Sequence, residues 1–213
     1  MNPTVYVVDD DESVTSALTN LFSSQNYTVS SFSSSEAFLT QADYPAPSCL
    51  IVDINMPGPD GFEVSRRLTE RGYTLPTIFL TGFGTIPVTV KAMKAGACEF
   101  LTKPVDPDLL LEAVAEALAT SEANRDSSNE KQVLTERHLS LTPRETEVML
   151  LAISGLQNKQ IAAEMGISEI TAKVHKRRVM EKMQVRSLSD LVRAAERLNI
   201  AKTLSRQQNS GLF

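Results

Sequence analysis

An aspartate placed where a phosphoryl group could be accepted is the first chemical feature of this chain. Asp53 directly follows the apolar run of residues 50–52, and the chain turns soon afterwards at Pro57 and Gly58. A short apolar run closed by turn residues predicts a buried strand, with Asp53 at its carboxyl end. Ligands of open α/β sheets bind at that edge of the sheet. We therefore expect Asp53 to accept a phosphoryl group.

Similar chemistry follows three other expected strands. Strands 4–8, 76–80 and 99–101 are followed by Asp9 and Asp10, by Thr81 and by Lys103, in that order. The carboxyl ends of parallel strands share one edge of a sheet, so these side chains should gather around Asp53.

The gathered set has the chemistry of phosphoryl transfer. Three carboxylates close together repel one another and raise one another's pKa values. A divalent cation relieves this repulsion; Mg²⁺, or Mn²⁺ in its place, takes oxygen ligands and shares them with phosphate. Lys103 would pair with phosphoryl oxygens and the Thr81 hydroxyl would donate to one. We expect Asp53 to act as the nucleophile of an in-line transfer.

Ordinary structural roles remain open for the same residues. The acidic run 10–12 could cap the helix that follows, and Asp53 could form the turn after its strand. Thr81 could be a strand-end hydroxyl and Lys103 a solvated loop residue. Taken singly, the structural roles are favoured for Thr81 and Lys103. The coincidence at four strand ends favours the phosphoryl site.

An alternation of strands and helices would position these residues. The expected strands are 4–8, 27–32, 50–52, 76–80 and 99–101, and the expected helices are 13–22, 36–41, 62–71, 88–95 and 109–118. This order predicts an α/β domain with a doubly wound, five-stranded parallel sheet covered on both faces.

Residues 3–120 resemble the receiver domain of a bacterial response regulator, which has a flavodoxin-like (CheY-like) fold. The motifs are Val8-Asp9-Asp10, Asp53-x-x-Met56-Pro57-x-x-x-Gly61, Leu80-Thr81-Gly82 and Lys103-Pro104. Residues 81–88 and 92–97 are especially similar to the FixJ-like branch. The resemblance implies that Asp53 is the phosphoacceptor and that Thr81 and Lys103 hold the phosphoryl group. It also implies metal ligation by Asp10 directly, by Asp9 through water and by the backbone carbonyl of Asn55, and it places Phe100 at an aromatic switch position.

Charge divides the chain into two halves. Residues 1–120 hold 6 Lys and Arg against 15 Asp and Glu, a net charge of −9, whereas residues 121–213 hold 15 against 11, a net charge of +4. An acidic half suits a cation and a basic half suits nucleic acid. No apolar run reaches transmembrane length and no leader is recognisable, so we expect a cytoplasmic protein without a membrane partner. Cys49 and Cys98 are expected to be buried free thiols.

The domain boundaries follow from composition and capping signals. We expect a first domain over 1–120, a polar linker over 121–138 that could extend the preceding helix, an all-α domain over 139–200 and a tail over 201–213. Thr142, Ser168 and Ser187 are expected N-caps, and a glycine turn separates the second and third helices. Four helices in this arrangement predict a helix-turn-helix domain.

The third of these helices has two faces. Ala172, Val179 and Met183 form a stripe that we assign to the core. The other side carries Lys173, Val174 and Arg177, flanked by Lys176 and Arg178. A basic outward face suits the major groove of double-stranded DNA, although a merely solvated basic face remains the alternative.

Residues 140–198 resemble the LuxR-type helix-turn-helix. The motifs are Leu141-Thr142-Pro143-Arg144-Glu145, Gly155-Leu156-x-Asn158-Lys159-x-Ile161-Ala162 and Ser168-Glu169-x-Thr171-x-Lys173-Val174-His175. The resemblance implies base contacts from Lys173, Val174 and Arg177, and phosphate contacts from Thr171, Lys159 and Arg178. Ala172 departs from the usual valine; its smaller side chain could loosen the recognition helix, or Met165 could fill the gap.

Together the resemblances imply a phosphorylation-dependent transcription regulator of the FixJ/NarL family. A sensor histidine kinase would transfer phosphoryl to Asp53, and the fourth helix and fifth strand would then form a homodimer that binds DNA, with RNA polymerase as a further partner. Beyond accepting and slowly losing this group, no enzyme activity is expected.

Two other functions stay open from the sequence. The receiver could serve only as a dimer scaffold for phosphorylation-independent DNA binding. A Mg²⁺-dependent phosphatase would need an acid–base carboxylate two residues after the nucleophile, where this chain has Asn55.

Overall fold

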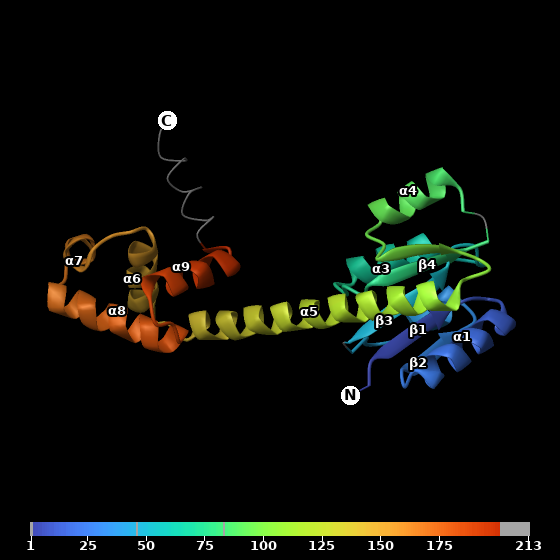
Figure 1. Cartoon of the computed structure of the whole chain (residues 1–213). Helices are drawn as coiled ribbons and strands as arrows, with labels where there is room; N and C mark the ends of the chain where they lie inside the picture. Colours follow the sequence, from blue (N-terminus) through green and yellow to red (C-terminus); the bar gives the residue numbers. More distant parts are fainter. Residues whose placement is uncertain (1, 46, 83, 201–213) are drawn as a thin grey trace. The chain divides into compact units, whose positions relative to one another are not determined.

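The computed structural model describes residues 2–45, 47–82 and 84–200 of the chain, so the expected tail lies outside the described residues. The chain divides into two compact units, residues 1–126 and 127–213. Figure 1 labels most of their helices and strands, and each unit is considered by itself.

Within the described residues of the first unit, five strands form one parallel sheet in the order β2-β1-β3-β4-β5. They are β1 (Thr4–Val8), β2 (Thr28–Phe32), β3 (Ser48–Asp53), β4 (Thr77–Thr81) and β5 (Glu99–Thr102). The connecting helices are α1 (Glu12–Ser24), α2 (Ser35–Leu39), α3 (Gly61–Glu70), α4 (Ile86–Lys94) and α5 (Pro107–Leu139). The doubly wound parallel sheet predicted from the alternation is confirmed.

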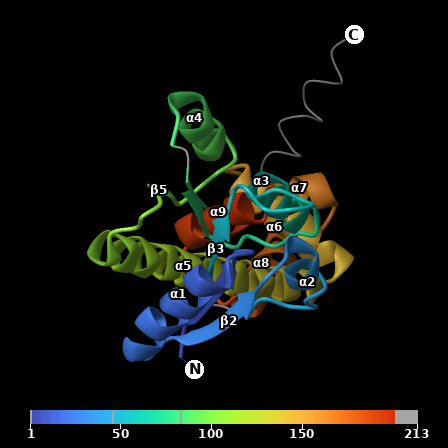
Figure 2. The same ribbon diagram turned by 90° about the vertical axis from the view of Figure 1, so that its right-hand side faces the viewer.

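Alternate strand residues supply two separate cores, one on each face of the sheet. Tyr6, Leu50 and Phe79 pack in the core that α2, α3 and α4 cover. Their strand neighbours, such as Val7 and Ile51, pack in the core that α1 and α5 cover. Figure 2 shows α1 and α5 on one side of the sheet and α2 and α3 on the other. Burial on both faces explains why the central strands β1 and β3 are almost continuous apolar runs, whereas the edge strand β2 carries two serines and is only partly buried.

The register of the sheet brings the strand ends to one edge. Val8 pairs with Val52, and Asp53 pairs with Leu80. Thr81 in turn pairs with Thr102 at the end of β5. The residues that follow these strands therefore meet at the same edge, as the sequence predicted.

Helix α4 packs less completely than the other helices of this unit. Ala92 is its only fully buried residue, whereas Ile86 is 82% exposed and Val90 and Met93 are about half exposed. Its N-cap, Thr85, makes no side-chain capping hydrogen bond. Apolar side chains at positions i, i+4 and i+7 thus form an uncovered face of α4.

Helix α5 continues through the residues expected to form a linker. Ser121 is buried and its hydroxyl accepts a 3.0 Å hydrogen bond from the Ser48 backbone nitrogen in the first unit. Leu134 is buried in the core of the second unit. The sequence predicted no packing for this segment. Single contacts such as those of Ser121 and Leu134 do not require a periodic stripe of apolar residues, so the sequence pattern does not reveal them.

Four further helices follow in the described part of the second unit: α6 (Pro143–Ile153), α7 (Asn158–Met165), α8 (Glu169–Met183) and α9 (Leu188–Arg197). The side chains of Thr142, Ser168 and Ser187 each accept the expected capping hydrogen bond. Gly166 ends α7 in the left-handed region, with φ of 65°. The predicted helix-turn-helix architecture is confirmed.

Among the described residues, none of the helices combines the length and the apolar character needed to span a lipid bilayer.

Candidate functional site

Three carboxylates meet at the carboxyl edge of the sheet. Asp9 follows β1, Asp53 ends β3, and both are buried, whereas Asp10 is exposed. One carboxylate oxygen of each residue lies within 4.8 Å of those of the other two. We call these three residues the acidic cluster.

Lys103 neutralises the buried part of the acidic cluster. Its Nζ donates to Oδ2 of Asp9 at 2.6 Å and to Oδ2 of Asp53 at 2.9 Å. The lysine side chain is 22% exposed, so these ion pairs are well shielded from water. The structure therefore brings the predicted lysine directly onto the predicted carboxylates.

Burial and ion pairing have opposite effects on the pKa values of Asp9 and Lys103. Burial raises the pKa of the Asp9 carboxyl, and the hydrogen bond from Lys103 opposes this without cancelling it. Burial acts to lower the pKa of the Lys103 ammonium, but its hydrogen bonds to Asp9 and Asp53 outweigh burial and raise the pKa. Burial thus prevails over pairing in setting the pKa of Asp9, whereas pairing prevails over burial in setting the pKa of Lys103.

The acidic cluster fits a hard divalent cation. Carboxylate oxygens are the ligands that Mg²⁺ prefers, and Asp10, which is exposed, leaves one side of the cluster open to a hydrated ion. A single lysine cannot balance three carboxylates, so one further positive charge would be favourable here.

Asn55 and Thr81 extend the site. The Asn55 backbone nitrogen donates to Oδ1 of Asp53 at 3.2 Å, which is also the turn role considered for Asp53. The Asn55 side-chain nitrogen donates to the buried Thr81 hydroxyl at 3.4 Å. The sequence pointed to Asn55 through its backbone carbonyl and through the absence of a carboxylate at its position, but it did not predict this side-chain link to Thr81.

The segment after β4 lies close against β5. A β-carbon on Gly84 would collide with Cγ2 of Thr102 and would approach the Phe100 ring. Phe100 itself is partly buried against the core on the α3 side of the sheet. Gly84 therefore lies next to Thr102 and close to Phe100, the aromatic residue that the sequence placed at a switch position.

Two residues beside the site have structural roles. Asp11 caps α1 by accepting from the Ser13 backbone nitrogen, as predicted for this part of the acidic run. Gly61 begins α3, and a β-carbon there would lie 2.7 Å from the Asp53 carbonyl oxygen. The glycine of the motif thus permits the close approach of α3 to the end of β3.

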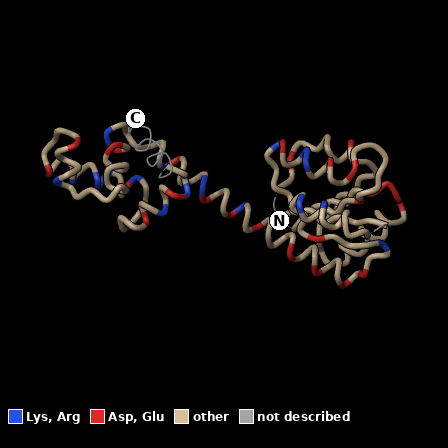
Figure 3. The backbone as a smooth tube through the Cα atoms, turned by 90° about the horizontal axis from the view of Figure 1, so that it is seen from above, with Lys and Arg blue, Asp and Glu red and all other residues tan. Residues whose placement is uncertain are grey.

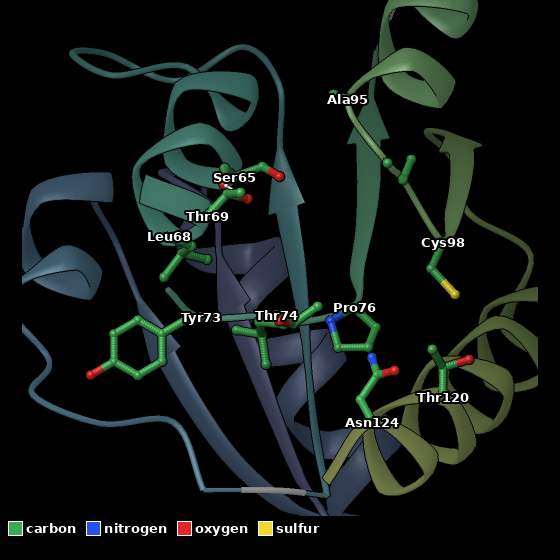
Figure 4. A pocket seen from close by; sticks show the side chains of 13 residues that line it. Ser65, Leu68, Thr69, Tyr73, Thr74, Pro76, Ala95, Cys98, Thr120 and Asn124 are labelled. Atoms are coloured by element: carbon green, nitrogen blue, oxygen red, sulfur yellow. Dashed lines mark hydrogen bonds between the residues drawn. The ribbon is translucent and has the colours of Figure 1, made fainter. Parts of the chain in front are cut away.

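A cavity of about 400 Å³ opens at the other end of β4 and β5, next to Pro76 and Cys98 (Figure 4). None of the described residues that line it is charged, so it lacks the chemistry of a phosphoryl or metal site. Cys98 is half-buried beside it and Cys49 is buried, and both thiols are free. Burial raises the pKa of Cys49 to about 12. Cys98 is thus less buried than predicted.

The second candidate site is the outward face of α8. Ala172, Val179 and Met183 are completely buried, as predicted, and Met165 packs in the same core as Ala172. The predicted contact residues Lys159, Thr171, Lys173, Val174, Arg177 and Arg178 are exposed, whereas Lys176 is partly buried. Figure 3 marks the charged residues along the backbone of each unit.

Two ion pairs involve α8. Arg177 Nε donates to Oε1 of Glu181 at 2.7 Å on the exposed face. On the buried side, Lys182 Nζ donates to Oε2 of Glu145 at 2.6 Å, and the Thr142 nitrogen donates to the same oxygen. The Lys182 hydrogen bond, followed by that of Thr142, lowers the pKa of Glu145 to about 2. This pair fastens the start of α6 to α8.

Comparison with known proteins gives matches for both units. Residues 5–115 match the family described as response regulator receiver domain, and residues 139–195 match the bacterial regulatory proteins of the luxR family. The response regulator protein TodT of Pseudomonas putida strain F1 is 43% identical over 194 residues, which cover 91% of this chain and 86% of TodT.

Two further relatives cover almost the same length. The transcriptional regulatory protein FixJ of Bradyrhizobium diazoefficiens is 39% identical, over 91% of this chain and 94% of its own. The solved structure of the response regulator StyR is 43% identical, with a TM-score of 0.81, and the match covers 92% of this chain and 99% of StyR.

Proposed function

Because the chain belongs to the FixJ/NarL family of response regulators, which join a receiver domain to a LuxR-type DNA-binding domain, we propose that Asp53 is the residue that accepts phosphoryl from a sensor histidine kinase. The chain is a DNA-binding transcription regulator of a two-component system. What remains to be assigned is which residues carry the signal.

One observation carries the assignment of Asp53. It is the member of the acidic cluster that ends the central strand β3, and it lies 2.9 Å from Lys103 Nζ. An Asp53 carboxylate oxygen would form the new P–O bond while the P–N bond to the kinase histidine breaks. Lys103 can then turn from the carboxylates to the phosphoryl oxygens, and the Thr81 hydroxyl lies at the same strand edge.

Mg²⁺, or Mn²⁺ in its place, would be held by Asp9, Asp10, Asp53 and the backbone carbonyl of Asn55. When bound, the ion supplies positive charge for the transferring group. The protein's own contribution is to hold buried Asp9 and Asp53 in place through their pairing with Lys103 and to present Asp53 at the carboxyl edge of the sheet.

Phosphorylation would act on the segment after β4. The new negative charge would draw the Thr81 hydroxyl toward it, and Gly84, packed against Thr102, would transmit this movement to Phe100 and α4. Helix α4 has the uncovered apolar face described above and few buried residues to hold it. We assign this face, with β5, to a homodimer contact formed on phosphorylation.

The output would be binding of α8 to double-stranded DNA. A dimer places two α8 helices on neighbouring half-sites, where Lys173, Val174 and Arg177 would reach base edges. Exposed Lys159, Thr171 and Arg178, with Lys176, would contact phosphates, which gives an affinity that falls with salt. Recruitment of RNA polymerase would follow at the promoter, and the site of action would be the cytoplasm, where the DNA lies.

A turnover enzyme is disfavoured by Asn55. A phosphatase would need an acid–base carboxylate at this position, and here an amide is bonded to the Thr81 hydroxyl instead. Loss of the phosphoryl group from Asp53 would therefore be slow. The scaffold alternative leaves the pairing of Lys103 with buried Asp9 and Asp53 without a purpose.

Incubation of the full chain with acetyl phosphate and Mg²⁺, followed by intact-mass measurement, tests the assignment. The wild type should gain about 80 Da, the mass of one phosphoryl group. The variant Asp53→Ala should gain nothing, whereas the matched control Asp108→Ala, which alters an exposed carboxylate on α5, should behave as the wild type. An adduct that survives Asp53→Ala would refute the assignment.

A further inference from the structure

An isoleucine stands almost fully in solvent at the start of α8. Ile170 is 78% exposed, in the first turn of the helix, directly after the capping residue Ser168 and Glu169. Among the described residues of the second unit, only Leu139 of α5 has a comparably exposed large apolar side chain. Isoleucine at this position covers no part of the core.

The position of Ile170 on the helix is opposite to the core. Helical spacing places Ile170, Val174 and Arg177 on one stripe, because they are separated by four and three residues. The buried residues Ala172, Val179 and Met183 occupy the opposite stripe. Val174 is also 45% exposed, so the centre of the outward face carries two adjacent β-branched apolar side chains.

Positive charge surrounds these two apolar side chains. Lys173, Arg177 and Arg178 are exposed on the same side of α8 or next to it. This charge favours a polyanion as the occupant over an apolar protein surface, and it orients the helix toward a phosphate backbone. The apolar pair would then face the floor of the groove between the phosphates.

The floor of the major groove offers one apolar group to such a pair. Base edges there present hydrogen-bond donors and acceptors, with the exception of the C5-methyl group of thymine. An isoleucine has no hydrogen-bonding atoms, so it gains from a thymine methyl and would leave the polar edge of any other base unpaired.

We propose that Ile170 selects thymine at one position of each half-site by packing against its C5-methyl group. The proposal rests on the proposed function of α8 and adds a specificity-determining residue to it. Ile170 and Val174 are separated by about 6 Å along the helix axis. Since base pairs are spaced by about 3.4 Å, the two side chains would serve base pairs one or two steps apart.

The experiment tests whether the effect of removing the methyl group of the base depends on the side chain at position 170. A DNA duplex is first selected from a random pool with the full chain treated with acetyl phosphate and Mg²⁺. Each thymine of the selected half-site is then replaced singly by uracil, which differs only by the absence of that methyl group. Binding constants are measured for the wild type, Ile170→Ala, Ile170→Val and the matched control Leu139→Ala, which also shortens an exposed apolar side chain.

At one thymine the wild type should lose about fourfold in affinity on replacement by uracil, as expected for one buried methyl group. Ile170→Ala should bind more weakly and should no longer distinguish thymine from uracil there. Ile170→Val should keep part of the preference, and Leu139→Ala should keep all of it. If no position shows this coupling, or if the selected half-sites lack thymine, the proposal is wrong.

A separate variant distinguishes failure of this proposal from failure of the proposed function. Lys173→Ala combined with Arg177→Ala should abolish specific binding if α8 is the reading helix. If this double variant binds normally, the assignment of α8 fails and the proposal fails with it. If it loses binding while Ile170→Ala shows no coupling to thymine, α8 remains the reading helix and only the role of Ile170 is overturned.

Discussion

Replacement of Lys103 by methionine should destabilise the first unit, and Mg²⁺ should restore much of the loss. Lys103 Nζ lies 2.6 Å from Asp9 and 2.9 Å from Asp53, and both carboxylates are at least nine-tenths buried. Removing one partner of a buried ion pair costs about 3–5 kcal/mol of unfolding free energy. The lysine is itself 22% exposed, so we take the lower end, about 3 kcal/mol. For a unit of this size that lowers the melting temperature by about 10 °C.

The chain provides its own reporter for this measurement. It has no tryptophan, and its four tyrosines are Tyr6, Tyr27, Tyr44 and Tyr73, which all lie in the first unit. The near-ultraviolet circular dichroism of tyrosine in the full chain therefore follows unfolding of the first unit. Melting curves would be recorded in EDTA and in about 10 mM Mg²⁺, because a ligand that binds only the folded state raises its stability with concentration.

Mg²⁺ should stabilise Lys103→Met more than the wild type. In the wild type the metal competes with the lysine for Asp9 and Asp53, whereas in the variant it is the only cation for the acidic cluster. The control Lys94→Met alters an exposed lysine of α4 and should melt as the wild type in both solutions. A variant that melts within about 2 °C of the wild type in EDTA, or an equal gain from Mg²⁺ in both proteins, would refute this reasoning.

Four other changes test separate parts of the structure. Gly61→Ala should cost about 1–3 kcal/mol of unfolding free energy, because its β-carbon meets the Asp53 carbonyl; Gly82→Ala, with open space around it, should melt unchanged. Glu181→Gln should raise DNA affinity about two- to threefold in a binding titration, since it releases Arg177; an unchanged affinity would mean that Arg177 does not need release. The pKa of Glu145 is lowered in the folded state, so its ionised carboxylate stabilises the fold fully above about pH 4.5, and this contribution is lost as the pH falls toward 2. In Lys182→Met this contribution is missing, so acid unfolding followed by far-ultraviolet circular dichroism should start at a higher pH than in the wild type. Identical unfolding curves for the two proteins would contradict the pairing of Glu145 with Lys182. Val90→Glu should prevent the dimer that we propose to form after treatment with acetyl phosphate, as followed by light scattering, without preventing the mass gain at Asp53; a normal dimer in this variant would place the contact away from α4.

The sheet edge was predictable because topology and chemistry point the same way. Five strands separated by helices leave only a parallel sheet as a compact solution, and a parallel sheet brings Asp9, Asp53 and Thr81 to one edge. The caps Thr142, Ser168 and Ser187 were predictable for a different reason: they depend on hydrogen bonds to residues three positions away.

The features that the sequence did not predict depend on contacts between residues far apart in the chain, or on the absence of helix-breaking residues. Helix α5 reaches Leu139 because no glycine or proline interrupts residues 108–139, although this stretch has no continuous apolar stripe. Ser121 accepts a hydrogen bond from the backbone of β3, and Leu134 packs in the core of the second unit. Both contacts are made with residues distant in sequence. The exposure of Ile170 could not be read from its sequence, since an isoleucine in the first turn of a helix is as compatible with burial as with solvent.

The ammonium group of Lys103 compensates the two buried carboxylates from within the chain. Before any metal binds, this lysine thus supplies part of the positive charge that this edge of the sheet requires. If phosphorylation of Asp53 needs Mg²⁺, as proposed, a cell short of magnesium would still hold folded regulator, but its kinase could not phosphorylate it. The pathway would fall silent without losing its regulator, and it would resume as soon as the metal returned, with no delay for new synthesis.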